Sequence, residues 1–351
     1  MQSDVPTILS PFPNQWYLAA FSHHLKVGEV KTLKMLDREL VCFRTQDGKA
    51  HVVDPHCPHF GAHLGYGSKV VENCIRCPFH GWQYDAESGQ CTHIPNGDPI
   101  PPKASLTHWH VDEVSGMVLV WYHADGAPPE WHVQPLPGFD DGKWTSWVEH
   151  EWIVDAHIQD ISENDADTSH SPIMHDFIDH KPDAESAIDG ALFTWKISMR
   201  PKLTAFGIPL NVGIPEGMST RVTSHRWGLA IGWITQAVKL LPWLHMRTQS
   251  LALTTPIDRT RCRLNMIHRV HKVPIPFLTT IMRRTYAKTF GKTVEQDISV
   301  WEHKVYLTRP IASASDAGVM QFRRWARQFY SGDKTRRSVR LEEQSVQAVA
   351  S

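Results

Sequence analysis

Short apolar runs separated by polar turns fill the first third of the chain. Four of these runs are rich in apolar and β-branched residues, which is typical of strands: 16–20, 39–44, 50–54 and 116–122. The polar residues 46–49 predict a hairpin turn, and the proline-rich segment 127–130 then breaks the pattern. We therefore expect a first domain built from strands, which spans residues 1–126.

The pattern changes after this break to a mixture of strands and helices. Residues 192–200 and 261–270 alternate in the manner of strands. Four stretches have apolar residues at helical spacing: 151–170, 277–291, 296–306 and 318–330. We expect a second domain over 127–351, with a polar tail from about 331 to 351 that frays. The chain as a whole is then of the α+β class.

The composition is that of an ordinary globular protein with little net charge. The 351 residues are 41% hydrophobic and 21% charged, enough for about two domains with cores of their own. The 36 basic and 37 acidic residues leave a net charge of -1, which argues against a nucleic-acid partner. Because neither a secretory signal nor a spanning apolar run is found, we expect a cytoplasmic protein.

Two short loops each offer one thiolate and one imidazole. Cys57 is followed by His59, and Cys77 by His80. Two cysteines and two histidines can hold one zinc ion, or a [2Fe–2S] cluster with both thiolates on one iron and both imidazoles on the other. The mixed order within each loop favours the cluster, because zinc fingers usually pair cysteine with cysteine and histidine with histidine.

The residues that flank these loops are in keeping with a cluster. Gly61 and Gly81 suit tight turns whose backbone N–H groups point toward sulfur. Trp82 and Tyr84 would shield one side of the group. The remaining cysteines are expected to be bystanders or small buried apolar side chains: Cys42, Cys74, Cys91 and Cys262.

A second group of polar residues lies at 163–175. His170 and His175 are five residues apart, a spacing that on a regular helix leaves two side chains well apart around the axis. We expect Pro172 to distort or end the helix between them, so that His175 turns back toward His170. Two imidazoles and one carboxylate hold the iron of non-haem oxygenases. The nearby carboxylates that compete for the third position are Asp165, Asp176 and Asp179.

Together the two motifs resemble those of the Rieske non-haem iron oxygenases. Cys-Pro-His-Phe-Gly-Ala at 57–62 and Cys-Pro-Phe-His-Gly-Trp at 77–82 fit the Rieske motif. The stretch 164–175 is similar to the Asn-x-x-Asp-x-x-His-x-x-x-x-His segment of the same family. The resemblance implies an all-β N-terminal Rieske domain and a helix-grip catalytic domain, in which helices pack on an antiparallel sheet.

The resemblance also implies a role for each candidate residue. The ligands of the [2Fe–2S] cluster would be Cys57, His59, Cys77 and His80. His170 and His175 would bind a mononuclear Fe(II), with the distant Asp297 as third ligand. Asp167 would carry an electron from a cluster histidine to this iron, and Asn164 would lie beside the iron.

The branch of the family that is most similar acts on steroids. The residues 321–330 resemble the end of the oxygenase component of 3-ketosteroid 9α-hydroxylase and of cholesterol 7-desaturase. This resemblance implies a terminal monooxygenase that activates O₂ and hydroxylates a hydrophobic polycyclic substrate. The chain lacks a nucleotide-binding fingerprint, so a ferredoxin, a flavin-dependent reductase or both would supply electrons. The family also implies a homotrimer.

Several alternatives stay open on the sequence. The same machinery could desaturate or oxidatively demethylate a sterol or another apolar or aromatic substrate. A Rieske electron carrier and a zinc-stabilised lipid-binding protein are the alternatives without catalysis. The apolar residues that could line a substrate cavity, each of which could equally be core, are Phe193, Trp195, Phe206, Ile208, Leu210, Trp227, Trp233, Leu240, Leu241 and Trp243.

Overall fold

A computed structural model gives the architecture of most of the chain. It describes residues 9–139, 141–175, 177–182, 186–201, 204–205, 208–209, 220–241 and 244–331. Within these residues, no helix combines the length and the apolar character needed to cross a membrane.

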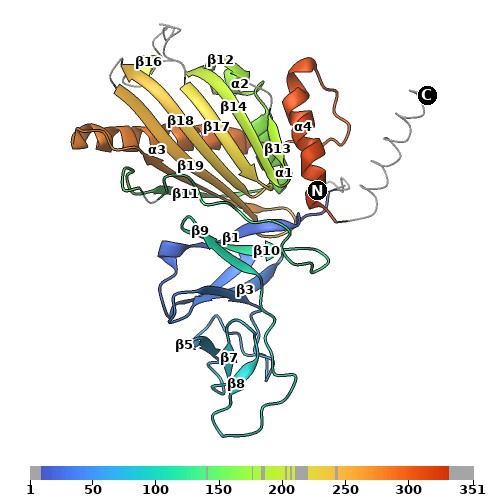
Figure 1. The fold of residues 1–351 in the computed structure, drawn as a ribbon. Coiled ribbons are helices and arrows are strands. Elements are labelled where there is room, and N and C mark those ends of the chain that lie inside the picture. The colour runs from blue at the N-terminus through green and yellow to red at the C-terminus, as the bar shows by residue number, and fades with distance from the viewer. Residues whose placement is uncertain are drawn as a thin grey trace.

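Three small antiparallel sheets build the N-terminal part, which is drawn in blue to teal in Figure 1. The first sheet has the order β1-β10-β9, the second β2-β3-β4 and the third β5-β6-β7-β8. The strands are β1 (Gln15–Phe21), β2 (Val30–Met35), β3 (Arg38–Arg44), β4 (Ala50–Val53), β5 (Lys69–Val71), β6 (Cys74–Arg76), β7 (Gln83–Asp85), β8 (Cys91–His93), β9 (Val111–Val114) and β10 (Met117–Tyr122). A short 3₁₀ helix, η1 (Ser22–His24), follows β1.

A large antiparallel sheet dominates the C-terminal part. Its strand order is β11-β20-β19-β18-β17-β14-β12, with β13 paired to β14, and β15 and β16 form a separate pair. The strands are β11 (Val148–Val154), β12 (Phe177–Pro182), β13 (Ala187–Asp189), β14 (Leu192–Pro201), β15 (Thr204–Ala205), β16 (Ile208–Pro209), β17 (Thr220–Trp227), β18 (Ile231–Leu241), β19 (Leu244–Pro256) and β20 (Cys262–Val270).

Helices cover one face and one end of this sheet. They are α1 (Ile158–Ser162), η2 (Glu163–Ala166), α2 (Ser171–Met174), α3 (Pro276–Trp301), η3 (Ala314–Asp316), α4 (Ala317–Ala326) and η4 (Arg327–Phe329). The long helix α3 crosses the sheet over β20 and β11, and α4 stands beside β13 (Figure 1). This is the α+β arrangement that the sequence predicts.

The two parts share one hydrophobic core. Buried side chains of β1 and β10 belong to the same apolar cluster as those of β19, β20 and α4. Backbone hydrogen bonds join the parts as well, from Leu36 N–H to Pro256 O (2.8 Å) and from Asn14 N–H to Phe329 O (2.6 Å). A second, smaller core lies between β3, β4 and the region of β5–β8, and contains Cys57 and Cys77.

The structure corrects two of the predicted helices. The segment 151–170 is not one helix, because its first residues belong to β11, whose inward and outward positions alternate and which pairs with β20. The segment 277–291 and residues 296–301 belong to the single helix α3, which runs through Gly291 and ends at Trp301, so that the predicted helical residues 302–306 lie beyond it. The strands predicted at 16–20, 39–44, 50–54, 116–122, 192–200 and 261–270 are confirmed within a few residues.

Candidate metal centres

The two Cys-His loops have almost the same backbone geometry. In each loop the cysteine N–H donates to the carbonyl five residues further on, at 2.9 Å in both. The N–H of Gly61 donates back to the carbonyl of Cys57 (2.9 Å), and that of Gly81 to the carbonyl of Cys77 (3.2 Å). Both glycines have a positive φ, 75° and 73°, which only glycine adopts readily. The loops are thus a matched pair, as the two halves of the motif suggest.

The side chains of the loops separate into an inner and an outer pair. The thiols of Cys57 and Cys77 are buried in the smaller core. The imidazoles of His59 and His80 lie 4.6 Å apart at 70°, His80 is exposed and His59 is partly buried. A group held between the loops would therefore show its histidine edge to the outside.

Neighbouring aromatic side chains cover parts of both pairs. Trp82 stacks on His59 (4.2 Å, 11°), and the hydroxyl of Tyr84 lies 3.2 Å from the Cys57 sulfur. Burial raises the pKa of Cys77, and the adjacent Cys57 raises it further. Two buried thiols side by side are readily ionised only with a cation between them, so the donor set fits an iron–sulfur cluster.

The spacing of these four donors also bears on the zinc alternative. A single tetrahedral zinc ion, with bonds of about 2.0–2.3 Å, would draw all its donor atoms to roughly 3–4 Å of one another. In the described part of the chain, three or more donors converge to within 4.8 Å at two places, and neither includes a residue of these loops. The wider spacing fits two irons better than one zinc.

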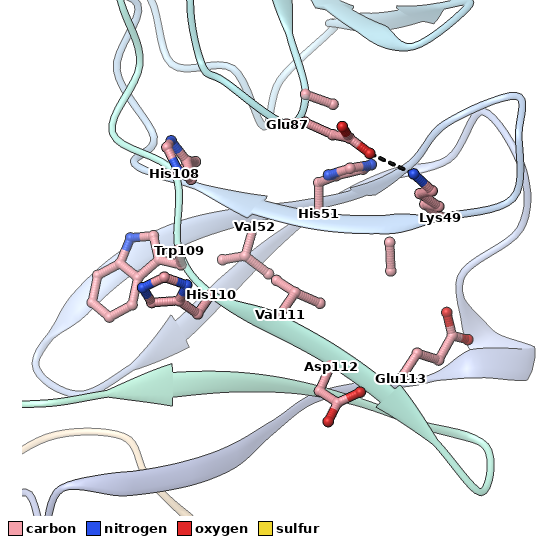
Figure 2. Close-up of a pocket in the computed structure, with 12 residues that line it drawn as sticks. Lys49, His51, Val52, Glu87, His108, Trp109, His110, Val111, Asp112 and Glu113 are labelled. Carbon is pink, nitrogen blue, oxygen red and sulfur yellow. Dashed lines mark hydrogen bonds and ion pairs between the residues drawn. The ribbon is translucent and has the colours of Figure 1, made fainter. Parts of the chain in front are cut away.

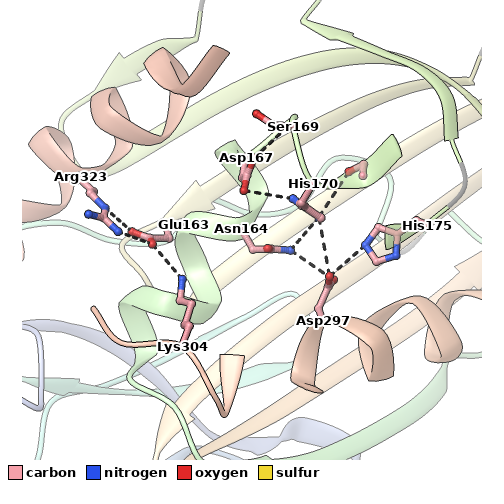
Figure 3. Close-up of polar contacts among 10 residues, drawn as sticks. Glu163, Asn164, Asp167, Ser169, His170, His175, Asp297, Lys304 and Arg323 are labelled. Atoms are coloured by element: carbon pink, nitrogen blue, oxygen red, sulfur yellow. Dashed lines mark hydrogen bonds and ion pairs between the residues drawn. The ribbon is translucent and has the colours of Figure 1, made fainter. Parts of the chain in front are cut away.

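The second centre brings together three residues that are far apart in the sequence (Figure 3). The Nε2 atoms of His175 and His170 lie 3.0 and 3.8 Å from Oδ1 of Asp297. The two rings are 5.3 Å apart and nearly perpendicular, at 87°. Asp297 is buried, and its Oδ1 faces both imidazoles. A buried carboxylate oxygen faced by two imidazoles fits a divalent iron, with further positions left for other ligands.

The local backbone explains how the two histidines meet. His170 is the N-cap and His175 the C-cap of the one-turn helix α2. Pro172 lies in the first turn of this helix, where a missing N–H costs nothing. The expectation that Pro172 ends a helix between the histidines is therefore wrong, because the proline starts one. Asp297 reaches the pair from near the C-terminal end of α3.

Two more residues of the motif contact this group. The amide Nδ2 of Asn164 lies 3.3 Å from Oδ2 of Asp297 and 3.4 Å from Nε2 of His170. Asp167 lies on the other side of the ring, with Oδ2 3.5 Å from Nδ1 of His170, and accepts from Ser169 N–H at 2.9 Å. Burial raises the pKa of Asp167, but the contacts with His170 outweigh it and the pKa falls below the usual value.

The competing carboxylates do not join the group in the described structure. Asp165 accepts from the guanidinium of Arg226, at 2.9 Å from Nε and 2.6 Å from Nη2, and from Ser224 Oγ at 3.3 Å. These contacts hold the Asp165 carboxylate against β17 of the sheet. Asp176 and the side chain of Asp179 lie outside the described residues.

A buried ionic cluster that the sequence did not predict lies next to this centre. Glu163 accepts from Nε and Nη2 of Arg323, both at 2.7 Å, and from Lys304 Nζ at 3.1 Å. Lys304 Nζ also lies 3.0 Å from Asp160. These contacts, which we call the Glu163 clamp, tie η2 to the segment after α3 and to α4 (Figure 3). Partners so distant along the chain leave no local sequence signal.

The apolar residues proposed as a cavity wall have mixed positions. Phe193 is core, since its ring packs at 5.3 Å against both Phe322 and Trp325. Trp227 and Trp233 are buried in the same core, and Trp195 is partly buried against it. The side chains that lie outside the described part are those of Phe206, Ile208, Leu210, Leu240, Leu241 and Trp243.

A hollow of about 430 Å³ lies elsewhere, in the N-terminal part (Figure 2). Its wall is polar and includes Lys49, His51, His110 and Asp112. The ion pair between Lys49 and Glu87 crosses its rim. None of its lining residues belongs to either candidate metal centre.

Comparison with known proteins covers both parts of the chain. Residues 15–106 match the family described as "Rieske [2Fe-2S] domain", and residues 120–330 match the "3-Ketosteroid 9alpha-hydroxylase C-terminal domain". A cholesterol 7-desaturase of Xenopus laevis is 31% identical over 95% of this chain and 74% of its own length. A protein of Rhodococcus rhodochrous named "Probable 3-ketosteroid-9-alpha-monooxygenase, oxygenase component" is 28% identical over 93% of this chain and 82% of its own.

A solved structure supports the fold independently. Dicamba monooxygenase bound to dicamba superposes with a TM-score of 0.69 at 19% identity, over 92% of this chain and 98% of that one. At such low identity the likeness concerns the fold alone. With the family matches, it confirms the predicted order of an all-β iron–sulfur domain and an α+β domain.

Proposed function

Because this chain belongs to the Rieske non-haem iron oxygenases, in the family of the 3-ketosteroid 9α-hydroxylase C-terminal domain, we propose that it is a terminal oxygenase that hydroxylates a steroid or sterol. The chain is an O₂-dependent oxidoreductase whose cofactors are a Rieske [2Fe–2S] cluster and a mononuclear iron. The substrate proposal is supported by two relatives whose names state cholesterol and a 3-ketosteroid as substrates.

We assign the cluster to the matched loops and the iron to the second centre. The cluster ligands are Cys57, His59, Cys77 and His80. The iron ligands are His170, His175 and Asp297. Their convergence from the two ends of α2 and from α3 on one buried carboxylate oxygen is the observation that carries the proposal. When bound, this iron supplies the place where O₂, electrons and substrate meet.

The residues around the iron ligands hold them in position. Asn164 contacts both Asp297 and His170, so its amide fixes the angle between these two side chains. Asp167 faces Nδ1 of His170, which favours the proton on that atom and leaves Nε2 free to bind a metal. Asp167 lies on the outer side of the ring, the side from which an electron would arrive.

We propose that electrons pass between chains in a homotrimer. In Figure 1 the region of β5–β8 and the helix α2 lie at opposite ends of the molecule, which supports transfer between chains rather than within one chain. Both ends carry exposed apolar side chains. Phe60 and Phe79, beside the cluster histidines, are 72% and 64% exposed, and Ile173, between the iron histidines, is 84% exposed. Apolar residues exposed next to both centres support a contact that covers them.

The proposal includes an external electron donor and leaves two alternative reactions. A ferredoxin, a flavin-dependent reductase or both would reduce the cluster, since the chain has no nucleotide-binding fingerprint. Desaturation and oxidative demethylation use the same residues and are alternative outcomes. A pure electron carrier would have no use for three converging ligands in its second domain.

A reconstituted assay tests the proposed function. The purified chain is combined with a ferredoxin, a reductase and NADH, and is offered sterols, ketosteroids and aromatic acids. Mass spectrometry should show the gain of one oxygen on a steroid or sterol, whereas the loss of two hydrogens would assign desaturation. Iron analysis should give three irons per chain. Two irons per chain and no turnover would leave an electron carrier.

A further inference from the structure

A second convergence of metal-binding side chains includes no residue of either proposed iron centre. His23 and His24 form the short helix η1 directly after β1, and Glu149 is the second residue of β11. Nε2 of His23 lies 2.8 Å from one oxygen of Glu149, and Nε2 of His24 lies 3.5 Å from the other. Within the residues that the structure describes, this group and the iron triad are the two sets whose donor atoms all lie within 4.8 Å of one another.

The spacing of the donors is as close as at the iron centre. There the two imidazole nitrogens lie 3.0 and 3.8 Å from the carboxylate oxygen of Asp297. Tetrahedral zinc, with bonds of about 2.0–2.1 Å to nitrogen and oxygen, places neighbouring donors roughly 3.3 Å apart. At the second group the two imidazole nitrogens face different oxygens of Glu149, at 2.8 Å from Oε1 and 3.5 Å from Oε2, and these distances bracket this value.

The surroundings orient the two imidazoles and leave room for water. The ring of Phe21 stacks on His23 (5.7 Å, 26°) and meets the ring of His24 edge-on (5.7 Å, 82°). The backbone carbonyl of His24 accepts from Lys31, whose ammonium is also 3.4 Å from Glu29 and is thereby paired away from the group. The histidine side chains are half exposed, so a water molecule can reach a fourth position on a bound ion.

We propose that His23, His24 and Glu149 form a binding site for a divalent transition-metal ion of the zinc type. Two neutral imidazoles and one carboxylate suit a borderline-soft cation, whereas Mg²⁺ and Ca²⁺ prefer all-oxygen sites. The histidines come from the iron–sulfur domain and the carboxylate from the catalytic domain. A bound ion therefore links η1 to β11 and stabilises the contact between the two domains.

Zinc titration of the iron-loaded protein tests the site. Isothermal titration calorimetry with Zn²⁺ should give one site per chain, and the thermal unfolding midpoint should rise with added zinc. Glu149→Gln and His24→Asn should each weaken binding more than about tenfold and abolish the rise. The matched control is His132→Ala, because His132 forms an exposed pair with Asp112 (3.0 Å) that lacks a third ligand. It should bind zinc like the wild type.

A further variant separates this site from zinc that displaces iron. His175→Ala removes an iron ligand, yet it should keep one zinc site of unchanged affinity if the site is the one proposed. Circular dichroism and the visible spectrum of the cluster verify that each variant is folded. Absence of zinc binding in the wild type, or equal binding in the wild type and in both Glu149→Gln and His24→Asn, would overturn the proposal.

Discussion

Asp167 contacts His170, one of the three proposed iron ligands, without being one of them. Its carboxylate faces Nδ1 of His170, while Nε2 of the same ring faces Asp297. In the proposed function, this side chain would orient the imidazole and transmit an electron to the iron. A change at Asp167 should therefore affect the reduction of the iron and leave the binding of both metal groups intact.

Replacement of this carboxylate tests that separation. Asp167→Asn should keep three irons per chain and an unchanged cluster spectrum, and should nearly abolish turnover. The measurements are iron analysis, electron spin resonance of the reduced cluster, and product formation. Asp155→Asn, at an exposed position on the same segment, is the control. Full activity in Asp167→Asn would remove the assigned role.

His268 is a buried histidine that should make stability depend on pH. It is 1% exposed, its Nδ1 lies 2.9 Å from Ser250 Oγ, and the rings of His150 and Tyr286 lie 5.6 and 5.7 Å away. Burial, with a smaller effect of His150, lowers the pKa of His268 to about 3. Below about pH 6.5, His268 binds a proton in the unfolded chain but not in the folded chain, so the free energy of unfolding falls as the pH is lowered.

A variant isolates this contribution. Between pH 7 and pH 5 the wild type should lose about 2 kcal/mol more unfolding free energy than His268→Gln, which cannot titrate there. Urea unfolding of both proteins at the two pH values measures the difference. An equal loss in both proteins would mean that His268 is protonated in the folded state.

At the level of elements, the sequence predicts what is local and misses what is distant. The ligand loops could be predicted because four donors and two glycines lie within 25 residues of chain. The strand β11 could not, because its partner β20 begins more than a hundred residues later and its own residues also fit a helix. The interruption predicted within α3 is absent because a glycine costs a helix only about 1 kcal/mol, which 26 residues readily offset.

The Glu163 clamp joins three elements around the iron centre. Glu163 precedes Asn164 on η2, Lys304 follows α3, and Arg323 belongs to α4. Burial lowers the pKa of Lys304, but Asp160 and Glu163 outweigh it and hold the pKa above its usual value. The Glu163 clamp thus holds η2 against α4 and against the segment that follows α3.

Loss of the anion should weaken both the fold and the iron site. Glu163→Gln leaves Lys304 and Arg323 without their shared partner, which should cost about 3 kcal/mol of unfolding free energy. Iron content should fall from three toward two per chain while the cluster spectrum stays intact. Arg323→Ala should act in the same direction, and Arg324→Ala, at the exposed neighbouring position, should not. Normal iron content in Glu163→Gln would limit the clamp to a structural role.

At the scale of the whole molecule, the region of β5–β8 and the helix α2, which carry the two proposed centres, lie at opposite ends of the folded protein (Figure 1). If electrons cross between subunits, defects in different chains should complement each other. Cys77→Ser chains lack a cluster and His175→Ala chains lack the iron, so each alone should be inactive. Trimers assembled from both kinds should recover part of the wild-type turnover. Light scattering measures the assembly, and no recovery in mixed trimers would exclude transfer between chains.

The core shared by the two parts limits how this protein can be rebuilt. The two domains cannot be exchanged independently. A graft of the first domain onto a foreign second half would expose the apolar side of β19, and β1 would keep its partner β10 but lose its packing against β18 and β19. The cluster loops, by contrast, rest on the separate smaller core. The surface around the cluster loops can therefore change to suit a new electron donor, while the core shared by the two domains stays the same.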